Sequence, residues 1–78
     1  MNNRSIIYPD ILIAEALECS HREIIEGLAL GLHPKWDSLA HLRVMMALEK
    51  NYGVDINDDS IKQFHTRDAI HQRYAEIL

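Results

Sequence analysis

Residues 37–53 contain the sequence signals of one complete amphipathic helix. Asp37 and Ser38 are both favourable N-cap residues, and Gly53 is suited to the left-handed conformation that ends many helices. Between them, apolar residues recur at the three- and four-residue spacing of a helix face: Leu39, Leu42, Met45, Met46 and Leu48. We therefore expect a helix that begins at residue 37 or 38, ends near residue 51 and carries an apolar stripe.

The remainder of the chain also favours helices, because it contains no alternating strand pattern of useful length. Pro9 is tolerated only in a first turn, so the first helix is expected from near residue 8 to near residue 18. Residues 57–60 offer caps for a brief third helix. Thr66 can cap a last helix, whose inward-facing residues are expected to be Ala69, Ile70, Tyr74 and Ile77.

Residues 19–37 are expected to form a long, partly ordered connection. Its start, Ser20-His21-Arg22-Glu23, has the form of a capping box, and a short helical turn is expected there. Two glycines weaken any longer helix and Pro34 ends it. Four apolar residues are expected to anchor this connection: Ile24, Leu28, Leu30 and Leu32. Long structured loops in small domains are often functional.

The chain has 78 residues and is expected to form a single domain over residues 1–78. The predicted fold is all-α, a small antiparallel four-helix bundle with three main helices and a short third one. A domain of this size buries only about 60% of its unfolded surface. A deep, enclosed active site is therefore not expected, and a module that presents a group is favoured over one that encloses a substrate.

Composition narrows the function further. The net charge is −4 and the eight basic residues are scattered, which argues against nucleic acid as the main ligand. No apolar run approaches the ~20 residues that span a bilayer, and no signal peptide is recognised. The single cysteine, Cys19, excludes an internal disulfide and agrees with a reducing cytoplasm. A cytoplasmic monomer is expected.

Beyond the helix pattern, the sequence around Ser38 resembles the acyl and peptidyl carrier proteins. The similarity rests on Asp37-Ser38-Leu39 at the start of a helix about midway along the chain. It continues through Leu39–Glu49, which is similar to the second helix of that family, and through Tyr52-Gly53-Val54-Asp55-Ile56 after it. Asp58, Asp59 and Thr66 also stand where the family has its third-helix start and fourth-helix cap. The resemblance covers nearly the whole chain.

This resemblance implies that Ser38 is the attachment point of a 4′-phosphopantetheine arm taken from coenzyme A. The arm would carry acyl or aminoacyl groups as thioesters, and the protein would catalyse nothing itself. Asp37 would help to present Ser38 to a phosphopantetheinyl transferase, and Leu39 would contact partners. Further partners would be an acyl- or aminoacyl-loading ligase and downstream transferases. The positive end of the helix dipole would favour the phosphodiester.

Two departures from the family point to a dedicated pathway rather than bulk fatty acid synthesis. The second helix of fatty-acid carriers is strongly acidic, whereas this one has Ala40, His41, Arg43 and Lys50. The glycine form before the serine is replaced by Lys35-Trp36, which looks more like specialised stand-alone carriers. We therefore expect partners to recognise a mixed-charge helix, with Trp36, Arg43 and Met46 as recognition residues.

Other interpretations remain open at this stage. Ser38 alone is an ordinary N-cap, and the fold could serve as an unmodified binding or regulatory module. A small enzyme ranks last, because no acid–base or nucleophile constellation is present. Trp36 could instead cover the core, and Met45 and Met46 could fill the core or line an acyl tunnel. No metal site is expected, and solvated or capping roles are expected for His21, His33, His41, His65 and His71.

Overall fold

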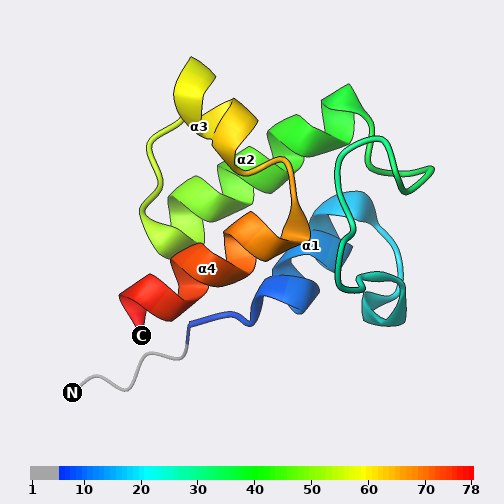
Figure 1. The fold of residues 1–78 in the computed structure, drawn as a ribbon, viewed down its shortest axis with the longest axis horizontal. Helices are drawn as coiled ribbons and strands as arrows, with labels where there is room; N and C mark the ends of the chain where they lie inside the picture. Colours follow the sequence, from blue (N-terminus) through cyan, green and yellow to red (C-terminus); the bar gives the residue numbers. More distant parts are fainter. Residues whose placement is uncertain (1–5) are drawn as a thin grey trace.

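The computed structural model describes residues 6–78, and they fold mainly into helices (Figure 1). The elements in chain order are α1 (Pro9–Leu17), the 3-10 helix η1 (His21–Glu23), α2 (Ser38–Tyr52), α3 (Asp58–Gln63) and α4 (Arg67–Ile77). The described chain has no strand and only one isolated bridge, between Ala29 and Thr66. The all-α prediction is therefore confirmed. None of the helices in this part of the chain is long and apolar enough to cross a membrane.

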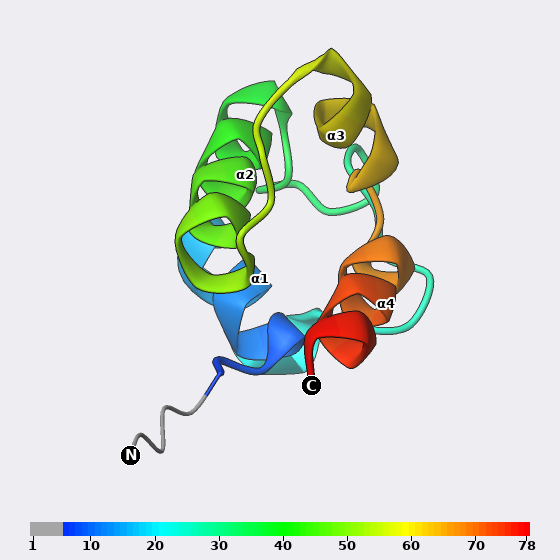
Figure 2. The same cartoon turned by 90° about the vertical axis from the view of Figure 1, so that its left-hand side faces the viewer.

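Three longer helices and one short helix make up the bundle. Helix α1 packs against both α2 and α4, and α2 also contacts α3 and α4. In Figure 1, α1 runs opposite to α2 and α4, which point toward the same side of the molecule. Figure 2 shows α2 and α4 on opposite sides of the molecule, with the short α3 near one end. The predicted helix order is confirmed, with three main helices and a short third one.

Local capping explains where the helices begin and end. The Asp37 side chain accepts a hydrogen bond from the Ala40 amide at 2.8 Å, and Thr66 accepts one from the Ala69 amide at 3.0 Å. At α3, Asn57 and Ser60 form a reciprocal capping box. Gly53 ends α2 with a φ of 68°, which is the left-handed conformation expected for it. The sequence signals for these ends are therefore confirmed.

The core lies between α1, α2, α4 and the long connection. Its α2 face differs from the predicted stripe, because Leu39, Leu42 and Met46 are 65%, 49% and 61% exposed. The α2 residues that are buried instead are Ala40, His41, Val44, Met45, Leu48 and Tyr52. Of the predicted stripe, Met45 and Leu48 are part of the core, whereas the other three residues are exposed. The histidine ring can be buried here because both of its nitrogens are hydrogen-bonded.

The connection between α1 and α2 is ordered by a few anchors. Ile24 and Leu28 are buried as expected and Leu30 is partly buried, but Leu32 is 70% exposed, which corrects its predicted role. The capping box at Ser20 forms and opens η1. Around the Ala29–Thr66 bridge, the Leu30 amide donates to the His65 carbonyl and the Arg67 amide donates to the Leu28 carbonyl, both at 2.9 Å. These bonds tie the connection to the start of α4.

An ion pair joins the first turns of α1 and α4. Arg67 binds both carboxylate oxygens of Asp10, at 2.9 and 3.1 Å, and His71 Nε2 lies 2.7 Å from Oδ1. Burial alone would raise the pKa of Asp10, but the hydrogen bonds from Arg67 and His71 outweigh it and lower that pKa. On α4 itself, Ile70 is buried, and the other predicted inward-facing residues, Ala69, Tyr74 and Ile77, are partly buried against the core.

Candidate functional site

Ser38 occupies the first position of α2 and is exposed to solvent. The N-cap is Asp37, whose Oδ1 accepts from the Ala40 amide. The structure thus separates two roles that the sequence left open, because Asp37 caps the helix and Ser38 does not. Ser38 therefore presents an exposed hydroxyl that the helix does not need for its own stability.

The start of α2 suits a phosphate ester. Helix α2 runs over 15 residues and has no acidic residue in its first turn. Its first backbone N–H groups carry the positive end of the helix dipole, which stabilises anions placed at this end. The carboxylate of Asp37 is held against the Ala40 amide. A 4′-phosphopantetheine group on Ser38 would thus place its negative phosphodiester at the favourable end of the helix, so the residues present fit this group.

Close to Ser38, the buried rings of Trp36 and His41 link the segment before α2, α2 itself and α3 through hydrogen bonds. The Trp36 indole Nε1–H donates to His41 Nδ1 at 3.1 Å, and His41 Nε2 lies 2.9 Å from the Ile61 carbonyl oxygen. Because Nδ1 accepts a hydrogen bond, the proton of a neutral ring must be on Nε2, where it is donated to Ile61. Trp36 and His41 are 0% and 3% exposed. Both ring nitrogens and the indole N–H are therefore satisfied.

This arrangement corrects two predictions. Trp36 was expected to contact partners, but its side chain is fully buried and covers the core beneath the loop. Its contribution to recognition can only be indirect, through the position of the segment that ends at Ser38. His41 was expected to be solvated or to cap a helix, but it is a buried, hydrogen-bonded core residue. The burial of Trp36 agrees with the alternative that it covers the core, whereas the burial of His41 depends on a distant acceptor, the Ile61 carbonyl of α3.

A shallow, mostly apolar hollow lies beside His41. It has a volume of about 300 Å³ and is lined by Leu30, His41, Ile61, Lys62 and His65. His41 follows Ser38 by about one helical turn, so the hollow lies near the start of α2. A larger and more polar hollow of about 450 Å³ lies toward the other end of α2, lined by residues from 53–64 and 69–76. The smaller hollow is therefore the one nearer to Ser38.

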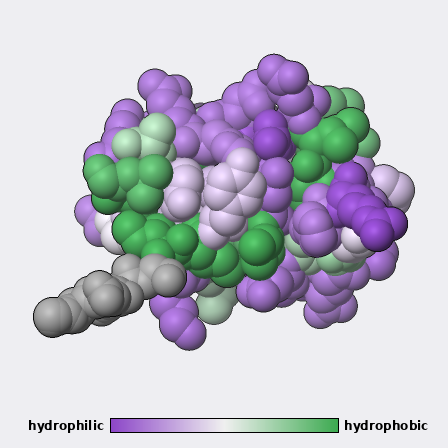
Figure 3. Space-filling view, turned by 90° about the horizontal axis from the view of Figure 1, so that it is seen from below, coloured by the Kyte–Doolittle hydropathy of each residue, from purple (hydrophilic) through white to green (hydrophobic). Residues whose placement is uncertain are grey.

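An exposed apolar row follows Ser38 along α2. Leu39, Leu42 and Met46 are spaced by three and four residues, so they share one face of the helix. Met46 is accordingly available to a partner, which is compatible with its predicted recognition role and does not test it. Exposed apolar residues also occur elsewhere, and the face in Figure 3 shows separate hydrophobic areas between hydrophilic ones. Exposure alone therefore does not identify this row as a binding surface.

Arg43, the predicted basic recognition residue, lies on the exposed side of α2 but is also bound within the molecule. Its Nε donates to the Ala16 carbonyl at 2.9 Å, near the end of α1. A cation at this position suits the negative end of the α1 dipole. Arg43 therefore links two helices while part of its guanidinium stays available to a partner.

A second group of side chains, Cys19, Glu23 and His33, was not predicted as a site: no metal site was expected, and His33 was expected to be solvated or to cap a helix. His33 Nε2 lies 2.7 Å from Glu23 Oε1, and the Cys19 sulfur lies within 4.8 Å of the other two ligand atoms. Burial and the nearby Glu23 raise the pKa of Cys19, whereas the hydrogen bond from His33 lowers the pKa of Glu23. The four-residue spacing of Cys19 and Glu23 was visible, but the sequence did not show that the loop returns His33 to them.

Comparison with models of protein families, with curated proteins and with solved structures gives no significant match for this chain. The candidate site is therefore interpreted from its own residues and from the sequence resemblance.

Proposed function

We propose that this chain is a carrier protein that holds acyl or aminoacyl intermediates as thioesters on a 4′-phosphopantetheine arm attached to Ser38. The observation that carries the proposal is the division of roles at the start of α2. Asp37 caps the helix through the Ala40 amide, and Ser38 stands exposed at the first helical position. The resemblance of the surrounding sequence to carrier proteins supplies the identity of the modification.

The proposed modification is a phosphoryl transfer from coenzyme A. Ser38 Oγ forms a phosphodiester bond with the phosphorus that bears the pantetheine group, and the pyrophosphate bond of coenzyme A breaks. Adenosine 3′,5′-bisphosphate leaves, and the hydroxyl proton passes to a base of the transferase. The thiol of the arm then attacks the carbonyl of an acyl or aminoacyl group that a separate ligase has activated; the thioester bond forms, the bond to the activating group breaks, and that group leaves as the thiol proton passes to a base of the ligase. The carrier supplies the exposed hydroxyl and the helix N-terminus, and it catalyses neither step.

The mixed charge of α2 supports a dedicated pathway over bulk fatty acid synthesis. Only Glu49 is acidic within α2, while Arg43 and Lys50 are basic. Partners that read a uniformly acidic helix would gain little attraction here. We propose that the loading enzyme and downstream transferases contact the exposed row Leu39, Leu42 and Met46 together with Arg43. Trp36 contributes by fixing the segment before Ser38.

The modification is tested by intact mass spectrometry after incubation with coenzyme A and a broad-specificity phosphopantetheinyl transferase. The chain should gain the mass of one arm, and Ser38→Ala should abolish the gain. Ser20→Ala is the matched control, because Ser20 is an exposed serine at another helix start, and it should leave the gain intact. If several transferases produce no gain in the folded chain, the alternative of an unmodified binding or regulatory module is favoured.

The role of Arg43 has a separate test with the enzyme that loads the carrier. Arg43→Glu should lower the rate of loading, because it reverses the charge offered to partners. Arg43→Gln is the control, since it removes the charge without reversing it and can still donate a hydrogen bond toward Ala16. Unchanged loading of Arg43→Glu would exclude a recognition role for Arg43.

A further inference from the structure

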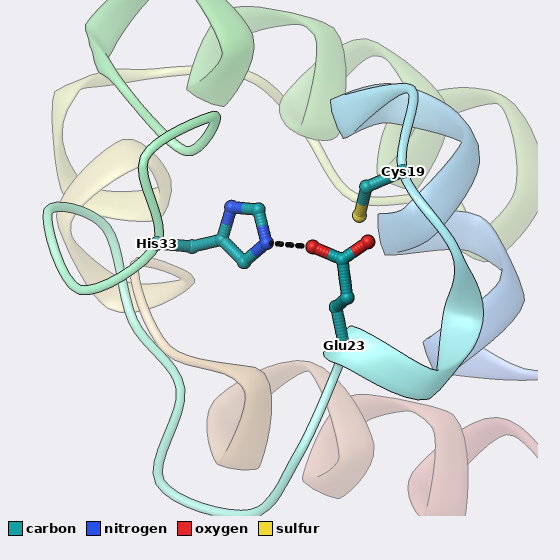
Figure 4. A group of neighbouring side chains, drawn as sticks. All are labelled: Cys19, Glu23 and His33. Carbon is teal, nitrogen blue, oxygen red and sulfur yellow. Dashed lines mark hydrogen bonds and ion pairs between the residues drawn. The ribbon is translucent and has the colours of Figure 1, made fainter.

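Three side chains with different ligand atoms meet within the connection between α1 and α2. Cys19 follows the end of α1, Glu23 is the last residue of η1, and His33 lies just before the segment that leads to α2. Their ligand atoms all lie within 4.8 Å of one another. Figure 4 shows the imidazole, the carboxylate and the sulfur turned toward a common space, with the His33–Glu23 bond drawn.

We propose that Cys19, Glu23 and His33 form a binding site for a divalent cation of the zinc type. Zn²⁺ binds thiolate, imidazole and carboxylate ligands and is often held by three protein groups with an open fourth position. Mg²⁺ and Ca²⁺ take oxygen ligands instead, so the sulfur and nitrogen select against them. The His33 side chain is 9% exposed and that of Glu23 is 48% exposed, which leaves the outer side open to water as a fourth ligand.

Binding requires a defined rearrangement at His33. The Lys35 amide donates to His33 Nδ1 at 3.0 Å, so in the metal-free chain the ring proton is on Nε2 and is shared with Glu23. When a cation binds Nε2, the ring proton moves from Nε2 to Nδ1, so His33 stays neutral and releases no proton. The Lys35 amide must then turn to solvent. The Cys19 thiol releases its proton to solvent, so binding sets free one proton in all. The affinity for the cation is limited because binding breaks two hydrogen bonds, the one between His33 and Glu23 and the one from the Lys35 amide to His33.

Glu23 can bind the cation without giving up its capping role. Its Oε2 accepts from the Ser20 amide at 3.2 Å, whereas its Oε1 faces His33. One oxygen thus remains for the capping box while the other serves the cation. Bound metal would hold the chain leaving α1, the η1 turn and the turn before Trp36 at one point, in a connection that has few apolar anchors. Such cross-links are a common means of stabilising small domains.

The charge of Lys35 allows a test in which a substitution should increase the affinity for Zn²⁺ instead of reducing it. Its ammonium group donates to the Glu18 carbonyl at 3.0 Å, and its charge acts on both Cys19 and Glu23. A nearby positive charge repels a dication, so removing it should tighten binding. Lys35→Gln should therefore increase the affinity for Zn²⁺, whereas adventitious binding at surface histidines would be unaffected.

The test is calorimetric titration of the reduced, metal-stripped full chain with Zn²⁺, with Mg²⁺ as the comparison ion. We expect one Zn²⁺ per chain and no Mg²⁺ binding. Cys19→Ser, His33→Gln and Glu23→Gln should each weaken binding by about tenfold or more, since even outer-shell changes cost roughly ten- to a hundredfold. His65→Gln, at an exposed histidine outside the group, should leave binding unchanged.

Cobalt provides a second readout that reports the sulfur directly. Co²⁺ bound to the chain should give a thiolate-to-metal charge-transfer band, and Cys19→Ser should remove it. Circular dichroism establishes that each variant is folded, and Glu23→Gln can keep only one of the two bonds, because Ser20 and His33 both donate to Glu23. If the wild-type chain shows no Zn²⁺ binding, or if the three ligand variants bind as well as the wild type, the proposal is overturned. Neither result bears on the modification of Ser38.

Discussion

The two apolar faces of α2 have similar composition and opposite surroundings. One face, with Val44, Met45 and Leu48, is 0% exposed and packs in the core. The other face, with Leu39, Leu42 and Met46, is between 49% and 65% exposed. Both faces read as apolar in the sequence, yet the fold uses only one of them. The exposed face is therefore available for contacts with other molecules, and it begins directly after Ser38.

The contrast is sharpest at two adjacent methionines. Met45 is 0% exposed and Met46 is 61% exposed. Met45→Ala should lower the free energy of unfolding by about 2–5 kcal/mol, because it leaves a cavity in the core. Met46→Ala should change it by less than about 0.5 kcal/mol. Urea denaturation of the two variants measures the difference, and similar effects at both positions would contradict the assignment of the two faces.

The next largest effect on the free energy of unfolding is expected at His41, the polar residue on the buried face of α2. His41→Leu fills the site but leaves the Trp36 indole N–H and the Ile61 carbonyl without their partner. We expect a loss of about 2 kcal/mol in the free energy of unfolding, the usual cost of an unpaired buried donor. His65→Gln is the exposed control and should have little effect.

A double-mutant cycle isolates this hydrogen bond from the packing of the rings. Trp36→Phe removes the indole N–H, and combining it with His41→Leu should cost less than the sum of the two single changes. Strict additivity of the two losses would mean that Trp36 and His41 are not energetically coupled.

The buried face of α2 packs against α1 and α4, which Asp10 joins through Arg67 and His71. Protonation of Asp10 in acid should therefore lower the free energy of unfolding. Asp10→Asn should cost about 1–3 kcal/mol near neutral pH, since it weakens hydrogen bonds made to a charged group. In the native chain, Arg67 and His71 lower the pKa of Asp10 despite its burial. This contribution is therefore complete above the ordinary carboxyl pKa of 3.8 and is lost as the pH falls through the lower pKa of the folded state.

Urea unfolding at about pH 7 and about pH 3 measures this difference. The gap between wild type and Asp10→Asn should narrow in acid. Asp68→Asn is the matched control, because Asp68 is 63% exposed and lies 3.8 Å from the same arginine. An equal gap at both pH values, or an equal loss in the control, would show that the charge of Asp10 does not link the helices.

The smallest effect is expected on the exposed face, in recognition rather than in stability. Leu39→Ser should reduce kcat/KM for modification by the transferase by about fivefold, which corresponds to about 1 kcal/mol of lost contact. The free energy of unfolding should stay nearly constant. Ile25→Ser, at a residue that is 60% exposed and outside α2, is the control. Equal rates for wild type and Leu39→Ser would remove Leu39 from the recognition surface.

Local signals in the sequence were sufficient for the helix ends, because caps and left-handed glycines depend on neighbouring residues. Asp37, Thr66 and Gly53 fall where they were predicted. Periodicity could not assign the faces of α2, since apolar residues cover both sides and only tertiary packing decides which side is buried. His41 was expected to be solvated or to cap a helix, and the sequence did not indicate that Ala40 would be buried.

The contacts between distant segments were also not predictable. His41 finds its acceptor in Ile61, 20 residues away, and Asp10 finds Arg67 at a separation of 57. His33 reaches Glu23 only because the connection turns back on itself. Such pairs depend on the three-dimensional path of the chain, so the sequence shows the residue types but not which of them will be partners.

The central claim is that the exposed hydroxyl at the start of α2 is the attachment point. Tandem mass spectrometry of peptides from the transferase-treated chain tests this most directly, because it locates the added group on a residue. We predict that the arm lies on Ser38 in the peptide containing Trp36-Asp37-Ser38-Leu39, with Ser20 and Ser60 unmodified. An arm found on another residue, or a folded chain that several transferases leave unmodified, would contradict the account.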